Sequence, residues 1–260
     1  MLTARTGTPP MGLQHVASLC TLTVMAAVIA AGFVARRTRP AVERRVRWGA
    51  VAIAAPTWLF MQTWFAIYAW DPVEAAPLHI CDLGGGSAMF ALAHRGRWWR
   101  AVLFFWGVGL TTQAFVTPVL TAEQGPHTMV FWLFWVSHAW VVGGAVYDFV
   151  VLGFRPTLGD LGRAIAVTAG WLAVVFTVNI IPDDGYNYGY VGPADDQPGV
   201  VALLGPWPLR VVFMAGIVLV GFTVIYLVAS RLPGGDNATE PREPRLQTPS
   251  RNQARSARDR

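Results

Sequence analysis

A histidine, a thiol and a carboxyl group occur within PLHICD, residues 77–82, in an otherwise apolar part of the chain. His79, Cys81 and Asp82 are residue types that can transfer protons, attack carbonyl carbons or orient another catalytic side chain. In a bilayer each ionisable group is costly, at about 2.5 to 3.5 kcal/mol on insertion scales. A further histidine, His138, lies in the apolar stretch FWLFWVSHAW. We therefore expect these side chains to face one another or a wet cavity.

The composition indicates that lipid surrounds most of the chain. Of its 260 residues, 54% are hydrophobic and 13% are charged, and 12 are tryptophan, which is unusual for a soluble domain. Long apolar runs with few charges predict an all-α bundle of seven transmembrane helices. The runs cover 15–34, 48–70, 78–94, 101–116, 130–152, 161–181 and 203–229. The third run, which contains PLHICD, and the fourth are the shortest.

Arginine marks one side of this predicted bundle. All 20 basic residues are arginine, and all of them except Arg5 and Arg210 follow the first, third, fifth and seventh runs. The connections at 71–77, 117–127 and 182–201 contain no arginine or lysine but do contain aspartate or glutamate. Because arginine near the end of a span favours the cytoplasmic side, we predict that the N-terminus lies outside and the C-terminus in the cytoplasm.

Polar side chains gather in the outer half of the predicted bundle when depth is counted at about 1.5 Å per residue. The inner half is nearly all apolar, with Asp148 as the main exception. His138 is counted several residues deeper than Cys81. The distribution predicts a polar pocket that opens outward. The residues expected to line it are Gln62, His79, Cys81, Asp82, Gln113, His138 and Asn179.

Three consecutive glycines, Gly84 to Gly86, allow two interpretations of the short third span. Interrupted spans often mark a binding site in the membrane, so the glycines could break the helix. Alternatively, they could permit close packing of a neighbouring helix. In an unbroken helix Cys81 points about 100° away from Asp82, so His79, Cys81 and Asp82 would converge only if the helix breaks.

The sixth connection, which contains GYNYGYVGPADDQPG, leads to Trp207 and Arg210 at the start of the seventh span. Tyrosines suit the headgroup level of a membrane, so this connection could cover the outer mouth of the pocket. Arg210 departs from the charge pattern because it lies near the outer side. With Trp207 it could bind the phosphate of a lipid headgroup. Alternatively, its long side chain could only carry the guanidinium group to the membrane–water interface.

Four motifs together resemble the YwaF-type integral membrane protein family over roughly residues 45–230. They are PLHICD, the histidine in FWLFWVSHAW, NIIPDDGYNYGY at 179–190 and LGPWP at 204–208. That family is similar to a eukaryotic ether-lipid acyltransferase branch, transmembrane protein 164. The resemblance implies a cysteine nucleophile and a histidine that move a fatty acyl group between phospholipids through a thioester. Matched by motif, these residues are Cys81 and His138.

The residues themselves leave other functions open beside a lipid acyltransferase or acyl hydrolase. A lipid-binding or small-molecule-binding protein and a transporter are the alternatives, although the apolar inner half argues against alternating access. Cys81 could be a packing residue, and Asp82 could serve only the dipole of a helix N-terminus. We expect no cofactor and no metal site, because the chain lacks Cys-x-x-Cys-His and histidine-rich tracts.

The predicted organisation has three parts. They are a short extracellular N-terminus at 1–14, a transmembrane domain at 15–230 and a disordered basic cytoplasmic tail at 231–260. The net charge of +5 indicates attraction to anionic lipid rather than to nucleic acid. We expect membrane lipids as partners and, from the arginine-only composition, the plasma membrane of a bacterium as location. The sequence predicts no oligomeric state.

Overall fold

The computed structural model describes residues 11–68, 76–121, 123–181, 186–193 and 199–233, and these contain helices but no strand. The α-helices are α1 (Met11–Thr38), α2 (Pro40–Tyr68), α3 (Ile80–His94), α4 (Arg97–Gly109), α5 (Met129–Val150), α6 (Leu158–Ile180) and α7 (Leu209–Ala229). Short 3-10 helices are η1 (Thr111–Phe115), η2 (Tyr188–Tyr190) and η3 (Gly199–Leu204). The predicted extracellular N-terminus and cytoplasmic tail fall largely outside the described residues and stay predictions.

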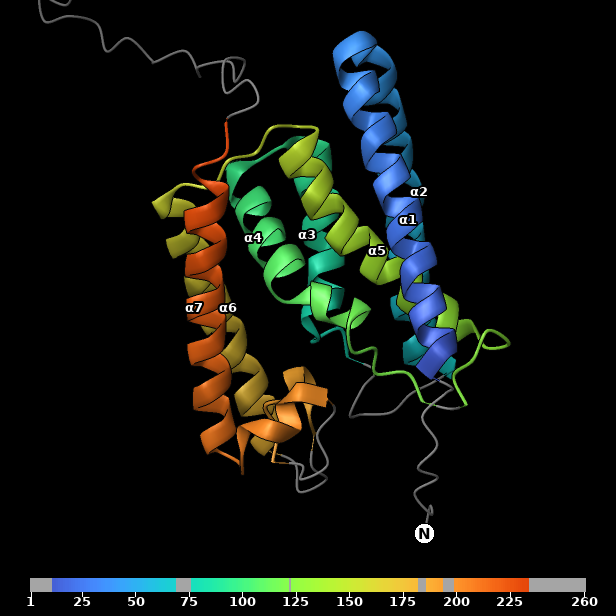
Figure 1. The fold of residues 1–260 in the computed structure, drawn as a ribbon. Helices are drawn as coiled ribbons and strands as arrows, with labels where there is room; N and C mark the ends of the chain where they lie inside the picture. Colours follow the sequence, from blue (N-terminus) through green and yellow to red (C-terminus); the bar gives the residue numbers. More distant parts are fainter. Residues whose placement is uncertain (1–10, 69–75, 122, 182–185, 194–198, 234–260) are drawn as a thin grey trace, which may run out of the picture.

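The helices form three groups that lie side by side (Figure 1). Helices α3, α4 and α5 pack against one another in the centre. The long α1–α2 hairpin covers α5 and α3 on one side, and α6 and α7 pack against α4 on the other. Consecutive helices alternate in direction, so α7 ends at the opposite end of the bundle from the start of α1 (Figure 1).

Each predicted apolar run corresponds to one α-helix, but the helices are not equivalent. Five of them, α1, α2, α5, α6 and α7, are long and apolar enough to cross a membrane. Helix α3 has 15 residues and α4 has 13, so α4 is only about 20 Å long where the hydrocarbon core is about 30 Å. Eight consecutive residues of α4, from Arg100 to Gly107, are buried. This helix is apolar because protein surrounds it, and its C-terminal end is followed by the tighter η1.

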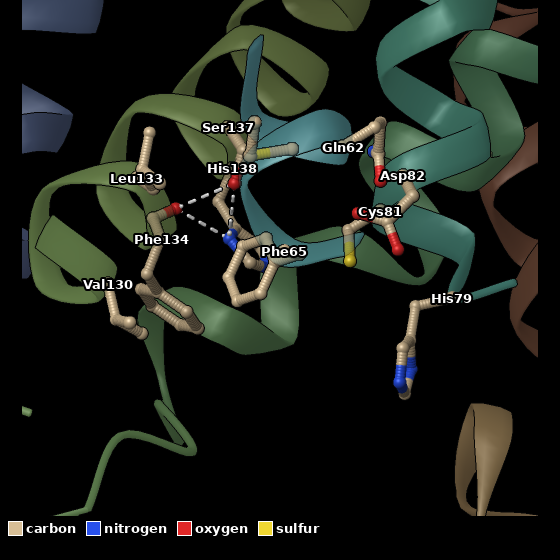
Figure 2. A pocket seen from close by; sticks show the side chains of 11 residues that line it. Gln62, Phe65, His79, Cys81, Asp82, Val130, Leu133, Phe134, Ser137 and His138 are labelled. Carbon is tan, nitrogen blue, oxygen red and sulfur yellow. Dashed lines mark hydrogen bonds between the residues drawn. The ribbon is translucent and has the colours of Figure 1, made fainter. Parts of the chain in front are cut away.

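Helix α3 runs unbroken through its three glycines, with Cys81 and Asp82 in its first turn (Figure 2). A Cβ atom on Gly84 would lie 3.0 Å from Val141, and one on Gly85 would lie 2.8 Å from the Trp58 ring. Both glycines therefore admit a close neighbour. The interpretation as a deliberate helix break is wrong, because the helix continues through all three glycines and the space beside Gly84 and Gly85 is filled.

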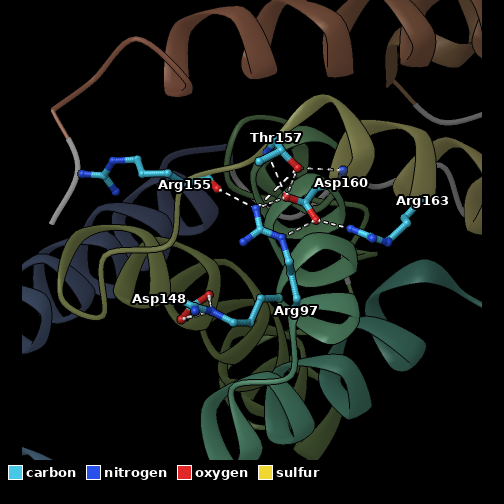
Figure 3. Close-up of polar contacts among 7 residues, drawn as sticks. Arg97, Asp148, Arg155, Thr157, Asp160 and Arg163 are labelled. Atoms are coloured by element: carbon cyan, nitrogen blue, oxygen red, sulfur yellow. Dashed lines mark hydrogen bonds and ion pairs between the residues drawn. The ribbon is translucent and has the colours of Figure 1, made fainter. Parts of the chain in front are cut away.

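The connections that carry arginine all lie at one end of the bundle (Figure 1). There the Nε atom of Arg100 on α4 donates to both carboxylate oxygens of Asp148 on α5, at 3.1 and 2.9 Å, and both side chains are buried. Asp160, in the first turn of α6, accepts from Arg97 at 2.6 Å and from Arg163 at 2.7 Å (Figure 3). Asp148, the exception in the predicted apolar half, thus joins the two most central helices.

We expect Asp148→Asn to lower the free energy of unfolding by about 3 to 5 kcal/mol, because it leaves the buried Arg100 guanidinium without a compensating charge. The matched control is Arg163→Gln. The Arg163 side chain is 42% exposed, so losing its ion pair should cost at most about 1 kcal/mol. Thermal unfolding of the purified proteins in one detergent compares them. Equal stability of the two variants would contradict this role for the pair.

Candidate functional site

A small cavity of about 150 Å³ lies where the first turn of α3 meets α2 and α5. Figure 2 shows Gln62, His79, Cys81 and Asp82 along one side and His138 on the other. Five of the seven residues predicted to line a polar pocket therefore share this cavity. The complete lining is Met61, Gln62, Phe65, His79, Cys81, Asp82, Val130, Leu133, Phe134, Ser137 and His138.

The position of Cys81 follows from how α3 begins. His79 is the N-cap residue, has extended backbone angles and provides no side-chain cap. The first amide groups of a helix have no intrahelical partner, so uncapped backbone donors lie directly beside Cys81. Two indole groups hold this start in place: Trp171 donates to the carbonyl of Leu78 at 2.8 Å and Trp58 to that of Asp82 at 2.9 Å.

His138 is oriented by its own helix. Its Nδ1 atom lies 2.7 Å from the carbonyl oxygen of Phe134, and its ring lies against the Phe134 ring with centroids 4.2 Å apart. A carbonyl oxygen can only accept a hydrogen bond, so Nδ1 carries the proton in this contact. In the neutral imidazole the lone pair is then on Nε2, which is the state a general base requires. The Ser137 hydroxyl lies 3.4 Å from the same Nδ1 (Figure 2).

A second and larger cavity, of about 510 Å³, adjoins the first. It lies between the central helices and the α6–α7 pair, and its lining is predominantly apolar. His79, Cys81, Phe134 and His138 line both cavities. The depth count that separated Cys81 from His138 is thus corrected by the packing of α3 against α5, which brings both residues to the same two cavities.

Gln113 also belongs to the larger cavity, whereas Asn179 lines neither. Asn179 is fully buried, and its amide donates to the carbonyl and accepts from the N–H of Tyr188, both at 2.9 Å. Trp207 donates to the carbonyl of Val191 at 3.1 Å and stacks on Phe176. These residues hold the part of the sixth connection at 186–193.

Arg210 is likewise turned towards this connection. Its guanidinium donates to the carbonyl of Gly192, and the residue is 2% exposed. The connection in turn covers His79, whose ring lies 5.3 Å from that of Tyr188 and 6.1 Å from that of Tyr190. Arg210 and Trp207 therefore contact the segment that lies against His79 and not the cavities.

Several site residues were not predicted from the sequence. Phe134 and Ser137 precede His138, and Trp171 lies on α6. Nothing in a run of apolar residues distinguishes a side chain that faces a cavity from one that faces lipid. Gln62 lies beside Asp82 at the smaller cavity (Figure 2). Within the described residues no group of three or more His, Cys, Asp or Glu side chains is arranged to hold a metal ion.

We expect Asn179→Leu to lower the free energy of unfolding by about 2 to 4 kcal/mol, since the N–H and carbonyl of Tyr188 both lose a buried partner. It should also make the chain near residues 186–193 more accessible to protease. Thr177→Val is the matched control on α6, because the exposed Thr177 hydroxyl donates only to the carbonyl of Ala173. Thermal unfolding and limited proteolysis measure both effects. If Asn179→Leu behaves like the control, Asn179 does not anchor the connection.

Comparison with known proteins identifies a family. The model of the TMEM164 family matches residues 10–226, well over half of the chain. No curated protein and no solved structure matches the chain. The resemblance to the transmembrane protein 164 branch is confirmed at the level of the family, while the YwaF-type assignment stays a prediction. With five helices long and apolar enough to cross a membrane, this multi-pass membrane protein belongs to the TMEM164 family.

Proposed function

We propose that the protein transfers fatty acyl groups between membrane lipids, with Cys81 as the acyl carrier and His138 as the base. The observation that carries this proposal is that Cys81 on α3 and His138 on α5 line the same two cavities, a small one that Asp82 also lines and a large one that is predominantly apolar. A thiol needs a base to become a nucleophile, and an acyl chain needs an apolar site beside it.

The proposed reaction has two balanced halves. Nε2 of His138 takes the thiol proton while Sγ of Cys81 attacks the ester carbonyl carbon of a donor lipid. The carbon–oxygen bond then breaks, and the departing alcohol takes the proton from His138. In the second half the hydroxyl of an acceptor lipid gives its proton to His138 and attacks the thioester. The carbon–sulfur bond breaks, and the proton returns to the thiolate. Water as the acceptor would make the protein an acyl hydrolase.

The start of α3 supports stabilisation of the negative charge that develops in these steps. The uncapped amides of Ile80 and Cys81 are hydrogen-bond donors, and the positive end of the helix dipole lies there. Preorganised backbone donors of this kind stabilise an oxyanion strongly. Asp82 and His79 flank the nucleophile and are positioned to orient the acyl group or the imidazole.

A binding protein without catalysis is the second candidate. A cavity of about 510 Å³ falls within the usual range for ligand sites, and an apolar lining alone can hold a lipid or another small apolar molecule. This alternative needs no chemistry at Cys81. A transporter would need the cavity to reach both sides of the membrane in turn, and the ion pairs at the arginine end favour a site open on one side only.

The decisive experiment measures acyl exchange between a phospholipid donor and a lysophospholipid acceptor by the purified protein. We expect Cys81→Ala and His138→Ala each to lower the rate by at least about 100-fold, the smallest effect usual for a positioned nucleophile or base. Cys20→Ala is the matched control, because Cys20 is a free, exposed cysteine on α1. Its rate should equal that of the unmodified protein.

A thioester at Cys81, detected as a hydroxylamine-sensitive acyl adduct, would identify the intermediate. Unchanged exchange in Cys81→Ala would remove the nucleophile and leave the binding protein as the better account.

We further propose that all seven helices cross or insert in the plasma membrane of a bacterium with the arginine end in the cytoplasm and the Cys81 end facing outward. A reporter fused after Arg97, between α3 and α4, should read as cytoplasmic, and one fused after Thr121, between α4 and α5, as external. The fusion in the α3–α4 connection is the decisive one for the orientation, because α3 and α4 are the two shortest α-helices. An external reading after Arg97 would invert the proposed orientation.

A further inference from the structure

A cluster of charged side chains lies where the α3–α4 connection meets α1, α2 and α5. It lies at the opposite end of α3 from Cys81, about 21 Å along that helix at 1.5 Å per residue. Its four guanidinium groups and two carboxylates leave an excess of two positive charges among the described residues. The members are Arg36 on α1, Glu43 and Arg47 on α2, Arg95 after α3, Arg100 on α4 and Asp148 on α5.

The two carboxylates of this arginine cluster already have close partners. The Nε atom of Arg47 donates to Oε1 of Glu43 at 2.9 Å. Both oxygens of Asp148 accept from Nε of Arg100. Arg36 lies at the edge of this network, since its Nη1 atom is 3.8 Å from Oε2 of Glu43. The carboxylates therefore compensate Arg47 and Arg100 more than the other two arginines.

Arg95 forms no ion pair with any carboxylate in the described part of the chain. Among the same residues its side chain donates only to the carbonyl of Leu152, at 3.3 Å, and its buried Nε atom has no partner. Burial, followed by the positive charge of Arg100, lowers the pKa of Arg95 from its ordinary value. The buried Nη2 atom of Arg100 likewise has no acceptor among these residues. Because uncompensated buried charge is costly, an anion would stabilise this cluster.

The backbone of Arg95 makes its side chain separable from the fold. Arg95 ends α3 with φ 56° and ψ 21°, in the left-handed region, and its N–H donates to the carbonyl of Ala91. Glycine is the usual residue at such a helix end, because a Cβ atom is unfavourable there. Arg95→Gly therefore removes the guanidinium group from a backbone that suits glycine.

The arginine cluster is open to a ligand on one side. The Arg36 side chain is 35% exposed and Arg95 is half-buried, whereas Arg47 and Arg100 are buried. A ligand can thus contact Arg36 and Arg95 directly, while the other two arginines contribute positive charge from the interior. Guanidinium groups bind phosphate oxygens in a bidentate manner. A phosphomonoester carries about −1.5 to −2 charges at pH 7, which matches the excess of two positive charges.

We infer that the arginine cluster binds one phosphate group, held directly by Arg95 and Arg36, and that a phosphomonoester suits it better than a phosphodiester. The group can belong to a membrane lipid, as in phosphatidic acid, or to a soluble phosphomonoester. The inference is independent of the proposed acyl transfer, because it requires neither Cys81 nor His138.

Thermal unfolding of the full-length protein, purified in detergent without phosphate, tests the inference. The probes are phosphatidic acid, phosphatidylglycerol and phosphatidylcholine with the same acyl chains, and glycerol 3-phosphate at constant ionic strength. We expect phosphatidic acid to raise the unfolding temperature by about 3 to 6 °C at ten times its dissociation constant. Phosphatidylglycerol should have a smaller effect, and phosphatidylcholine the smallest. A response to glycerol 3-phosphate would identify the soluble group as sufficient, and a response to phosphatidic acid alone would identify the lipid as the source.

Arg95→Gly should bind phosphatidic acid at least about tenfold more weakly, the loss expected for charged hydrogen bonds. Without phosphate it should be as stable as the unmodified protein, because the repulsion from Arg100 is removed. Arg36→Gln is a second variant that should also weaken binding. Arg37→Gln is the matched control: it removes the same charge from an exposed residue whose guanidinium lies 3.9 Å from the centre of the Phe33 ring. Its response should equal that of the unmodified protein.

Three results would overturn the inference. The first is no stabilisation by either phosphatidic acid or glycerol 3-phosphate. The second is equal affinity in Arg95→Gly and Arg37→Gln, which would indicate attraction by net charge alone. The third is a loss of stability in Arg95→Gly that is the same with and without the probes, which would leave Arg95 only as a contact to Leu152. Phosphate binding without acyl exchange would contradict the proposed function alone, and exchange without phosphate binding would contradict this inference alone.

Discussion

The ion pair between Arg100 and Asp148 joins the most buried helix, α4, to its central neighbour α5. Neither group could remain charged at that depth without the other, because an isolated buried charge costs several kcal/mol. The pair therefore fixes how α4 and α5 lie along each other. Since α3 packs against both helices, it also fixes the level at which α3 meets α5. The relation between Cys81 and His138 depends on that level.

The half of the bundle that contains the first turn of α3 is held by a different kind of contact. Three tryptophans donate their indole N–H groups to backbone carbonyls in or just before α3: Trp171 to Leu78, Trp58 to Asp82 and Trp140 to Gly85. A carbonyl in a helix can accept a second hydrogen bond, so these contacts leave the helix intact. Tryptophan thus provides a large apolar surface together with one directed bond, which suits the attachment of a short helix within a bundle.

The two adjoining cavities combine requirements that rarely occur together in lipid. Ionisable groups need a polar environment, and an acyl chain needs an apolar one. The first turn of α3 separates the two: Asp82 faces the smaller cavity only, while His79 and Cys81 face both. The 186–193 segment, held by Asn179, Trp207 and Arg210, covers the same turn through Tyr188 and Tyr190. Residues remote from the cavities in sequence thereby hold the segment that lies against His79.

The sequence by itself determined the helices and the group of candidate residues. Hydropathy is a property of each residue and its near neighbours, so every predicted run became an α-helix. Consecutive helices alternate in direction, so the end of one helix lies at the same level as the start of the next. Polar residues at these positions therefore gather at one end of the bundle, as Gln62, His79, Cys81, Asp82 and His138 do. Only the tertiary structure decided that Gly84 and Gly85 admit neighbours rather than break α3, that Asn179 holds a backbone segment, and that a large cavity follows α7. These features depend on which side chains of distant helices meet, and that is set by packing angles and depths that no single apolar run specifies.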